Sequence, residues 1–365
     1  MDWSKQQDKA LKAVARWYRD RDSQVFRLFG YAGTGKTTLA QHLAEGVDGE
    51  VVFGAFTGKA AHVLRQKGCE GASTIHSLIY RPAMGDEDDP EAEPMFTIRR
   101  DAPAADAHLI IIDECSMVDE ELGRDLLSFG VPVLVLGDPA QLPPVKGGGF
   151  FTEAEPDVML TEVHRQAADN PIIRLSMDIR EGGVPDYGAL GDSRVISRRE
   201  IDSDTILAAD QVLVGRNVTR SKYNQRIRTL LDFDGSIPCV GERLVCLRNN
   251  KQKGLLNGGI WEVKSRHGKK AGRLRFGLIP EDGGRVTQVS VLPEFFAGGA
   301  ESIPWPKRRN SDEFDYGYAL TVHKSQGSQW DRVVLFDESF AFREHKERWL
   351  YTAVTRAADQ ITIVR

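Results

Sequence analysis

One short segment restricts the fold of this chain more than any other: residues 30–37 read GYAGTGKT. An apolar run at 25–29 precedes the segment, and a stretch of helical periodicity at 36–44 follows it. Glycines let such a loop curl until its backbone N–H groups point at phosphate oxygens, and the N-terminus of the next helix adds about half a positive charge. The segment therefore predicts a strand–loop–helix unit that binds the phosphates of a nucleotide.

The chemistry of this loop suggests a role for each of its polar residues. We expect the Lys36 ammonium to reach the β and γ phosphates and the Thr37 hydroxyl to bind Mg²⁺. The expected cofactors are therefore ATP and Mg²⁺. The nucleotide contacts are expected at Gly30, Gly33, Thr34, Gly35, Lys36, Thr37 and Thr38.

Two carboxylates follow a second apolar run. Residues 109–112 read LIII, and Asp113 and Glu114 come directly after them. Ligands of open α/β sheets bind at the carboxyl ends of the strands. We therefore expect Asp113 to hold Mg²⁺ through its water shell, and Glu114 to orient and deprotonate the water that attacks ATP.

A third apolar run, at 133–136, leads into GDPAQLPP at 137–144. A rigid loop that contains proline is expected to carry Gln141 toward the γ-phosphate. Phosphoryl transfer also needs positive charge on the γ-oxygens in the transition state. If a second lobe without its own phosphate loop packs against the first, it can supply such an arginine. The candidates are Arg165 and Arg356.

Short apolar runs alternate with helical stretches along much of the chain, which is the pattern of an α/β fold with doubly wound parallel sheets. In the first half we expect strands at 25–29, 51–56, 109–112 and 133–136, and helices at 36–44, 59–66 and 120–127. A second lobe follows, with strands at 211–214, 333–336 and 361–364 and a helix at 219–230. The length of 365 residues agrees with about two domains.

Two segments interrupt this alternation. Residues 231–310 contain Gly-rich turns and short alternating stretches at 242–247, 259–263 and 273–278, which predict a small inserted β-barrel. Residues 80–100 are too few for a domain and fit a hairpin with the acidic cluster 86–93 at its tip. The expected organisation is a first lobe of 1–79 and 101–163, a hairpin insertion of 80–100, a second lobe of 164–230 and 311–365, and a barrel insertion of 231–310.

Charge and cysteine content restrict the partners and the compartment. The chain has 48 Lys and Arg against 53 Asp and Glu, and this balance argues against nucleic-acid binding through bulk positive charge while permitting a local basic groove. The 4 cysteines match neither a zinc site nor a dense disulfide framework. No apolar run approaches the ~18 residues that cross a bilayer, and the first residues lack an export signal. We therefore expect a cytoplasmic protein with reduced thiols and no membrane contact.

Eight blocks, taken in order, resemble the superfamily 1 helicases, and most of all their RecD-like branch. The resemblance covers nearly the whole chain. The blocks are GYAGTGKT at 30–37, TGKAA at 57–61, STIHS at 73–77, DECSMVD at 113–119, GDPAQLPP at 137–144, EVHRQ at 162–166, YALTVHKSQG at 318–327 and YTAVTRA at 351–357.

The resemblance implies two RecA-like lobes with ATP bound between them. It implies that Arg165 and Arg356 reach across to the nucleotide and that Gln7 contacts the adenine edge. It also implies that Gln326 and Gly327 lie at the nucleotide.

A path for a single strand across both lobes is implied by the same resemblance. Hydroxyl, His and Lys side chains suit contacts to phosphate and sugar, which position a strand without reading its sequence. The matching residues are Thr57, Lys59, Thr74, His76, Ser77, Thr321, His323 and Lys324. The two histidines have a second interpretation, as residues packed in the core.

The two insertions also resemble parts of the branch. Residues 231–310 resemble its SH3-like accessory domain, especially through RNN at 248–250 and KGLLNG at 253–258. The hairpin takes the place of an element that splits the duplex, and Met95 or Phe96 has two interpretations there, stacking on the last base pair or ordinary packing. The acidic run beside them repels phosphates, so we interpret it as a solvated loop.

Two positions depart from the pattern of the branch. Gln329 stands where relatives have Glu, which removes an expected charged contact near the ribose, and Phe56 replaces a common Pro. Neither position is expected to touch the phosphates, so we expect ATPase activity.

The sequence therefore predicts an ATP-dependent DNA helicase that moves along single-stranded DNA. The resemblance alone implies 5′ to 3′ polarity, and the expected form is a monomer acting on single-stranded and forked DNA. Three alternatives stay open. An RNA helicase uses the same lobes, an ATP-gated translocase or remodelling factor binds nucleic acid without unwinding it, and a small-molecule kinase needs only the phosphate loop.

Overall fold

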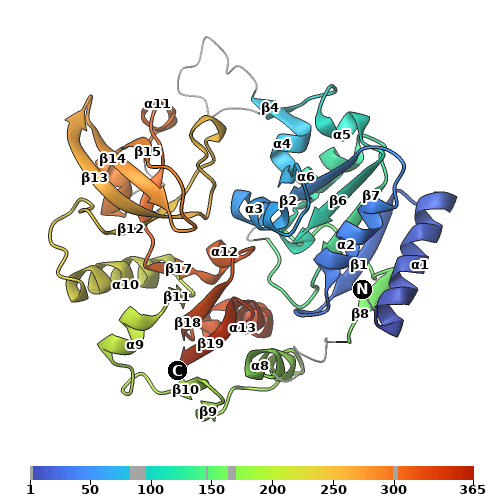
Figure 1. Cartoon of the computed structure of the whole chain (residues 1–365). Helices are drawn as coiled ribbons and strands as arrows, with labels where there is room; N and C mark the ends of the chain where they lie inside the picture. Colours follow the sequence, from blue (N-terminus) through green and yellow to red (C-terminus); the bar gives the residue numbers. More distant parts are fainter. Residues whose placement is uncertain (1–2, 83–95, 145–146, 163–169, 299–302) are drawn as a thin grey trace.

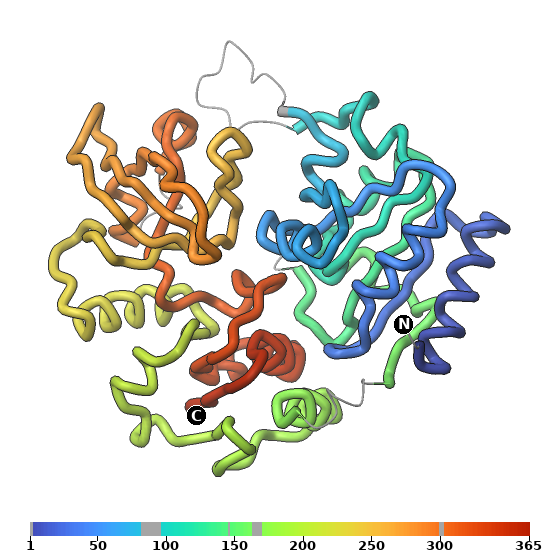
Figure 2. Tube along the Cα trace, in the orientation of Figure 1, coloured from blue at the N-terminus to red at the C-terminus, as the bar shows by residue number. Residues whose placement is uncertain are grey.

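The computed structural model describes residues 3–82, 96–144, 147–162, 170–298 and 303–365. The chain forms three bodies: two lobes that each carry a sheet with helices, and a smaller body of antiparallel strands (Figure 1). The chain trace enters the second lobe after the first, leaves it for the smaller body, and returns to it before the C-terminus (Figure 2).

The first lobe is a parallel sheet in the order β3-β2-β6-β7-β1-β8. Its strands are β1 (Val25–Gly30), β2 (Val51–Ala55), β3 (Ser73–Thr74), β6 (Leu109–Asp113), β7 (Val133–Gly137) and β8 (Val158–Leu160). Its helices are α1 (Lys5–Asp20), α2 (Lys36–Glu45), α3 (Gly58–Gln66), α4 (Ile75–Ile79), α5 (Pro103–Asp106), η1 (Cys115–Met117) and α6 (Glu120–Leu127). The strands and helices expected in this half are confirmed to within two residues at each end.

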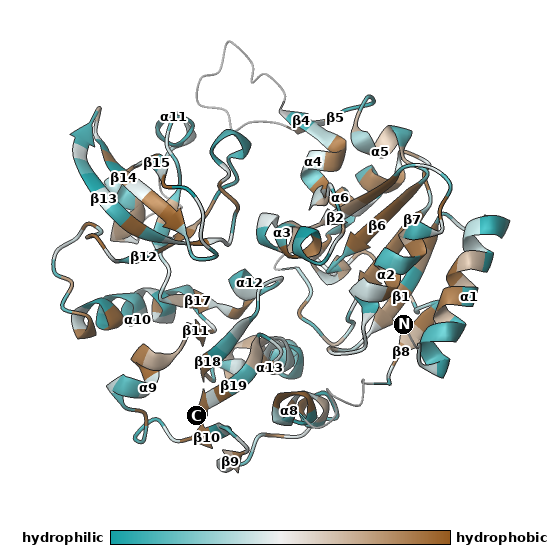
Figure 3. Cartoon of the chain, viewed as in Figure 1, coloured by the Kyte–Doolittle hydropathy of each residue, from teal (hydrophilic) through white to brown (hydrophobic). Residues whose placement is uncertain are grey.

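Apolar burial on both faces explains why the central strands form. The strands β6 and β7 are buried along nearly all of their length, as the runs LIIID and VLVLG require of a sheet covered by helices on both sides. Separate hydrophobic clusters fill the two faces. Figure 3 shows the same distribution, with the hydrophobic colour concentrated in the strands of this sheet.

The order of these strands brings the sequence motifs together. Strand β1 pairs with β7, and β7 pairs with β6, all in parallel. Their carboxyl ends therefore lie side by side at one edge of the sheet. The phosphate loop, Asp113 with Glu114, and the segment 137–144 leave the sheet at that edge.

The second lobe has the strand order β17-β11-β18-β19-β10-β9, parallel except for the β9–β10 pair. Its strands are β9 (Gly188–Leu190), β10 (Ser193–Ile196), β11 (Gln211–Val214), β17 (Ala319–Thr321), β18 (Trp330–Phe336) and β19 (Ala357–Val364). Its helices are α8 (Pro171–Arg180), α9 (Ser203–Ala208), α10 (Asn217–Leu230), α12 (Val322–Ser325), η5 (Ser339–His345) and α13 (Lys346–Val354). The two lobes give the α/β architecture with parallel sheets that the sequence predicted.

The smaller body is an antiparallel sheet in the order β15-β14-β13-β12-β16. Its elements are β12 (Arg243–Cys246), η2 (Lys251–Lys253), β13 (Ile260–Lys270), β14 (Arg273–Pro280), β15 (Thr287–Val291), η3 (Pro293–Ala297), α11 (Trp305–Arg308) and β16 (Phe314–Tyr316). A bridge between Val291 and Asp312 joins its two edges, so the sheet curls back toward itself.

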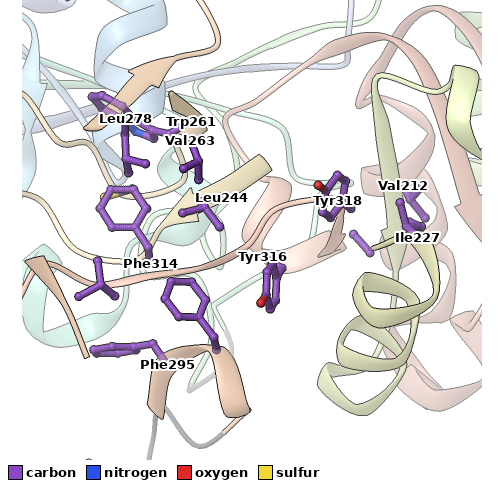
Figure 4. Packing of buried hydrophobic residues seen from close by; sticks show 14 of the residues in the cluster. Val212, Ile227, Leu244, Trp261, Val263, Leu278, Phe295, Phe314, Tyr316 and Tyr318 are labelled. Carbon is purple, nitrogen blue, oxygen red and sulfur yellow. The ribbon is translucent and has the colours of Figure 1, made fainter. Parts of the chain in front are cut away.

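The expected boundary of this insertion at residue 310 is wrong by one strand. Strand β16 pairs with β12 inside the antiparallel sheet, whereas the sequence analysis assigned it to the second lobe. The two bodies also share one hydrophobic cluster, in which Val212 and Ile227 of the lobe belong with Phe314 and Tyr316 of the insertion (Figure 4). The shared core explains why composition alone does not mark the boundary.

The segment expected as a hairpin contributes two short strands to the described residues. Strands β4 (Tyr80–Pro82) and β5 (Phe96–Ile98) pair in antiparallel register. The side chain of Phe96 is 54% exposed. Met95 and the acidic cluster 86–93 lie outside the described residues. Within the described part of the chain, no helix is long and apolar enough to span a membrane.

Candidate active site

The phosphate loop connects β1 to α2 through a tight backbone curl. Gly33 and Gly35 have φ of 77° and 79°, in the left-handed region that favours glycine. A Cβ on Gly30 would lie 2.7 Å from the Thr34 Oγ1 atom and 2.8 Å from the Leu160 Cβ atom, so a side chain there does not fit. The loop is therefore shaped as the glycines of the sequence predicted.

The two functional side chains of the loop point to its inner side and to the neighbouring strand. The Lys36 Nζ atom donates to the carbonyl oxygens of Gly30, at 2.6 Å, and of Tyr31, at 3.0 Å. The Thr37 hydroxyl donates to the Asp113 Oδ2 atom at 3.0 Å. Thr37 and Asp113 thus offer oxygen ligands to one point beside the loop, which is the donor type that Mg²⁺ prefers.

Glu114 occupies an unusual backbone position at the end of β6. Its φ of 54° and ψ of 43° are left-handed, and its N–H donates to the Asp113 Oδ1 atom at 2.8 Å. Burial raises the pKa of the Glu114 carboxyl, and this effect outweighs the lowering by the nearby Arg356 guanidinium. A carboxylate with a raised pKa is better suited to accept a proton from water than an ordinary one.

The segment after β7 holds a buried carboxylate and a buried amide. Asp138 accepts from the Tyr351 hydroxyl at 2.5 Å and from the Ala140 N–H at 3.0 Å, and burial raises its pKa. The Gln141 Oε1 atom is buried and has no hydrogen-bond partner among the described residues. The backbone N–H of Gln141 donates to the Asp138 carbonyl at 3.1 Å, which fixes the turn that carries it.

A cavity of about 440 Å³ brings these groups to one place. Both lobes line it: the first contributes the phosphate loop and the ends of β6 and β7, and the second contributes residues 327–329 with 355–356. The expected site residues on its wall are Gly33, Thr34, Gly35, Lys36, Thr37, Thr38, Asp113, Glu114, Gln141, Gly327 and Arg356. Lys36 and Arg356 therefore face the same cavity from opposite lobes.

Arg356 is buried, and backbone and hydroxyl oxygens of its own lobe hold it in place. Its Nε atom donates to the Thr352 carbonyl at 3.0 Å, and its terminal nitrogens donate to the Ser328 carbonyl and the Thr355 hydroxyl, each at 3.2 Å. All three partners are uncharged. The positive charge is therefore not neutralised by these contacts.

Other expected nucleotide residues lie beside the cavity or outside the described chain. The Gln7 side chain forms the capping box of α1 with Ser4 and donates to the Thr34 carbonyl at 3.2 Å. The Gly30 carbonyl accepts from the Lys36 Nζ atom at 2.6 Å, and the Gln326 amide donates to the Leu142 carbonyl at 3.0 Å. Arg165 lies outside the described residues.

A second cavity, of about 600 Å³, separates the first lobe from the inserted sheet. Three of the expected nucleic-acid residues line it: Lys59, Thr74 and Ser77. The opposite wall comes from the insertion and includes Asn249, Leu256, Trp261 and Asp282, which the sequence analysis did not assign. This cavity is a groove between the first lobe and the inserted sheet.

Lys59 is paired across the groove. Its Nζ atom lies 2.6 Å from the Asp282 Oδ2 atom, which belongs to the turn between β14 and β15. The His62 ring lies 3.8 Å from the same carboxylate oxygen. One acidic side chain of the insertion therefore faces two basic side chains of α3.

The three threonines expected on the strand path have a second role as helix caps. Thr57, Thr74 and Thr321 precede α3, α4 and α12, and the hydroxyl of each accepts from the backbone N–H three residues later. Such a cap contributes about 1 kcal/mol to a helix. Only Thr74 among them lines the groove.

The two histidines expected on the path differ in their surroundings. The His76 ring contacts Phe56, Tyr80 and Phe96, with centroid distances of 6.4, 5.5 and 6.2 Å. The His323 ring packs 5.6 Å from Phe342, and burial lowers its pKa. Burial lowers the pKa of His76 as well, so both histidines keep the packed-residue interpretation beside the strand-path interpretation. Ser77 shares a hydrogen bond with Thr74, and Lys324 is exposed at the end of α12.

Two known families match parts of this chain. Residues 2–199, more than half of the chain, match the AAA domain family, and residues 316–364 match the UvrD-like helicase C-terminal domain. These two matches cover the phosphate loop and the segment that carries Arg356.

Two curated relatives show how far the likeness extends along the chain. The chain is 30% identical over 366 residues to the ATP-dependent RecD2 DNA helicase of Deinococcus radiodurans, covering 91% of this chain and 46% of that protein. It is 24% identical to the conjugal transfer protein TraA of Rhizobium radiobacter, covering 99% of this chain and 32% of that protein. The chain thus spans less than half the length of these relatives.

Solved structures show the same fold. A structure of two coordinating Pif1 helicases at forked double-stranded DNA superposes with a TM-score of 0.62 at 20% identity, covering 99% of this chain and 92% of that chain. Pif1 helicase from Candida albicans gives a TM-score of 0.60 at 18% identity, covering 100% and 94%. The first family match covers more than half of the chain, and together with the relatives it supports the expected resemblance to the RecD-like branch of the superfamily 1 helicases: the chain belongs to the AAA domain family.

Proposed function

We propose that this protein is an ATP-dependent DNA helicase that moves along single-stranded DNA. The observation that carries the proposal is the 440 Å³ cavity, since Lys36 of one lobe and Arg356 of the other face it together. A nucleotide bound there touches both lobes, so its hydrolysis changes how they dock. A small-molecule kinase that uses the phosphate loop alone has no need of this shared wall.

The chemistry follows from the residues of the cavity wall. The loop N–H groups and Lys36 bind the phosphates, and Glu114 accepts a proton from the attacking water. Thr37 and Asp113 would hold Mg²⁺, which would neutralise charge on the phosphate oxygens. Gln141 and Arg356, with Arg165 as a second arginine, stabilise the γ-phosphate in the transition state. Gln7, Gln326 and Gly327 complete the proposed nucleotide site.

The groove and the second lobe carry the proposed strand. The path runs over Thr57, Lys59, Thr74, His76 and Ser77 and continues over Thr321, His323 and Lys324. The antiparallel sheet is proposed as the SH3-like insertion, and the β4–β5 hairpin as the element that meets the duplex. The proposed partners are single-stranded and forked DNA, bound by a monomer.

Strand displacement from tailed duplexes tests this function. We expect ATP-dependent unwinding of a duplex with a 5′ single-stranded tail and at least tenfold slower unwinding of the same duplex with a 3′ tail. The polarity rests on the RecD-like branch and not on any residue of this chain. The measurement is the rate of strand release with each tail, using equal tail lengths and a blunt duplex as control.

The same assay separates the alternatives. ATP hydrolysis that nucleic acid stimulates, with no strand release from either tail, indicates a translocase or remodelling factor and contradicts helicase activity. Stimulation by short RNA that outcompetes DNA of equal sequence indicates an RNA helicase. Hydrolysis that is indifferent to both nucleic acids contradicts the whole proposal.

The Lys59–Asp282 ion pair gives a prediction about strand affinity. Asp282→Asn releases the Lys59 ammonium for a phosphate, so we expect single-stranded DNA to bind roughly two- to fivefold more tightly at low salt. The gain should shrink as salt screens the charges. Fluorescence anisotropy with a labelled oligonucleotide at several salt concentrations measures it.

Glu262→Gln is the matched control for this prediction. Glu262 lies in the same inserted sheet, is partly exposed, and pairs with Lys264 at 2.5 Å instead of with the first lobe. The control removes the same charge without touching Lys59. Equal affinity gains in both variants would show that net charge, and not the pairing across the groove, controls binding.

A further inference from the structure

One hydroxyl of the second lobe lies between two segments of the first lobe. The Tyr351 O–H, on α13, donates to the Asp138 Oδ2 atom at 2.5 Å and accepts from the Ala32 N–H at 3.1 Å. Asp138 follows β7, and Ala32 belongs to the phosphate loop. Tyr351 and Asp138 are each 1% exposed. Both segments border the nucleotide cavity.

The neighbouring residues of the second lobe hold the same segment of the first. The Thr352 hydroxyl accepts from the Leu142 N–H at 2.9 Å, and the Gln326 amide donates to the Leu142 carbonyl at 3.0 Å. Gln141 lies between these contacts and Asp138. Its buried Oε1 atom, without a partner among the described residues, is thus carried on a segment that the second lobe fixes at both ends.

A further contact secures the phosphate loop from the same side. The Arg180 guanidinium, at the end of α8, lies 3.6 Å from the centre of the Tyr31 ring. Tyr31 and Ala32 are consecutive residues of the loop. Helix α8 therefore contacts the first of them through Arg180, and helix α13 contacts the second through Tyr351. Helix α13 also leads directly to Arg356, whose Nε atom donates to the Thr352 carbonyl.

We infer that Tyr351 is a positioning residue for ATP hydrolysis, which ties the phosphate loop and the Gln141 segment to the helix that leads to Arg356. This inference rests on the proposed function. The tie sets the distance between groups that must act on one phosphate, and it exists only while the lobes are docked. Tyr351 touches no phosphate itself.

The hydroxyl is difficult to replace because the Asp138 carboxylate that it contacts is buried. The Asp138 carboxylate accepts from two donors in the described structure, the Tyr351 hydroxyl and the backbone N–H of Ala140. Loss of the hydroxyl leaves a buried carboxylate with fewer donors and the Ala32 N–H without its acceptor. A buried polar group that is left without a partner costs free energy, so the segment that carries it is destabilised. The side chain that contacts both the loop and Asp138 then no longer links them, while the contacts to Leu142 and Tyr31 remain.

Tyr351→Phe tests the tie with the ring and its packing retained. We expect kcat for ATP hydrolysis to fall about tenfold, with and without single-stranded DNA, while KM for ATP stays within twofold. Hydrogen exchange of the peptide that contains Ala32 should become faster, since its N–H loses the acceptor. Asp138→Asn keeps an oxygen that accepts from Tyr351. Because the two residues share one hydrogen bond, we expect kcat of the double variant to be higher than the product of the two single effects predicts.

Tyr316→Phe is the matched control. The Tyr316 hydroxyl is also buried but has no hydrogen-bond partner among the described residues, and it lies in the inserted sheet. We expect the Tyr316→Phe variant to have the same kcat, and the same hydrogen exchange in the Ala32 peptide, as the unchanged protein. Thermal denaturation of all variants identifies a loss of folding.

The outcomes separate the tie from the proposed function. If kcat and the hydrogen exchange of the Ala32 peptide are both unchanged in Tyr351→Phe, the positioning role of Tyr351 is contradicted. This holds whether or not DNA stimulates ATP hydrolysis. Absence of DNA stimulation in the unchanged protein overturns the proposed function instead. Exchange of the Ala32 peptide decides on the tie even if the unchanged protein hydrolyses no ATP.

Discussion

Arg356→Ala is expected to lower the DNA-stimulated turnover of ATP by about 10³-fold or more. The guanidinium faces the nucleotide cavity from the second lobe, and its three hydrogen-bond partners are uncharged oxygens. It is therefore available to neutralise charge that develops on the γ-oxygens. Binding of ATP should change much less, because the phosphate loop of the first lobe is intact. Turnover and nucleotide affinity, measured separately, check both statements.

Two further variants show whether the charge or the local structure is responsible. Arg356→Lys keeps a positive charge but loses the planar donor array, so we expect a partial recovery of turnover. Arg332→Ala removes an exposed arginine of the same lobe that pairs with Asp210, and it should leave turnover unchanged. Turnover of Arg356→Ala within tenfold of the unchanged protein would contradict the assignment of this residue.

Glu114→Gln is expected to lower turnover by about 10²- to 10⁴-fold, the range for loss of a general base. The amide has the shape of the carboxylate but accepts no proton from water. Glu114 lies beside Asp113, which faces Thr37, so the substitution leaves the expected metal ligands in place. ATP should therefore still bind, and single-turnover measurements should show a slow chemical step.

The pH dependence of turnover gives an independent check on Glu114. Burial raises the pKa of this carboxyl above its ordinary value of 4.5. The base is active only when deprotonated, so turnover should fall as the pH drops through this raised pKa. Residual turnover of Glu114→Gln should lack this acidic limb.

Glu121→Gln is the control for both measurements on Glu114. Glu121 is exposed in the first turn of α6, away from the cavity wall. Its variant should keep the rate and the acidic limb. Loss of the limb in the control, or its persistence in Glu114→Gln, would assign the titration to another group.

Most strands of the two lobes were predictable because their chemistry is local. A run such as LIII at 109–112 is compatible with few structures other than a strand buried on both faces. The short pair β9–β10 was missed, since residues 188–190 are partly or fully exposed and two of the three are Gly and Ala. The boundary near residue 310 was missed because Phe314 and Tyr316 join a core shared by two bodies.

The meeting of the candidate site residues in one cavity was predictable for a different reason. Their motifs follow strands that end at the same edge of one sheet. The parallel sheet therefore brings Lys36, Asp113 and Gln141 together, and no contact between distant residues has to be predicted separately. Arg356 was placed there by resemblance, and the cavity agrees with that placement.

The contacts between bodies were not predictable from local pattern. Tyr351 meets Asp138 and Ala32 across 213 and 319 positions of sequence, and one hydroxyl leaves no periodic signal. Asp282 is one acidic residue in a turn, and nothing beside it in sequence indicates Lys59 as its partner. Such pairs depend on how the bodies dock.

A crystal structure with Mg²⁺, ADP–aluminium fluoride and an oligonucleotide tests the central claim most directly, since the fluoride group takes the place of the γ-phosphate in the transition state. The account predicts that the Lys36 ammonium and the Arg356 guanidinium both lie within hydrogen-bond distance of this group. A nucleotide held by the first lobe alone, with Arg356 still directed at the Thr352 and Ser328 carbonyls, would contradict it.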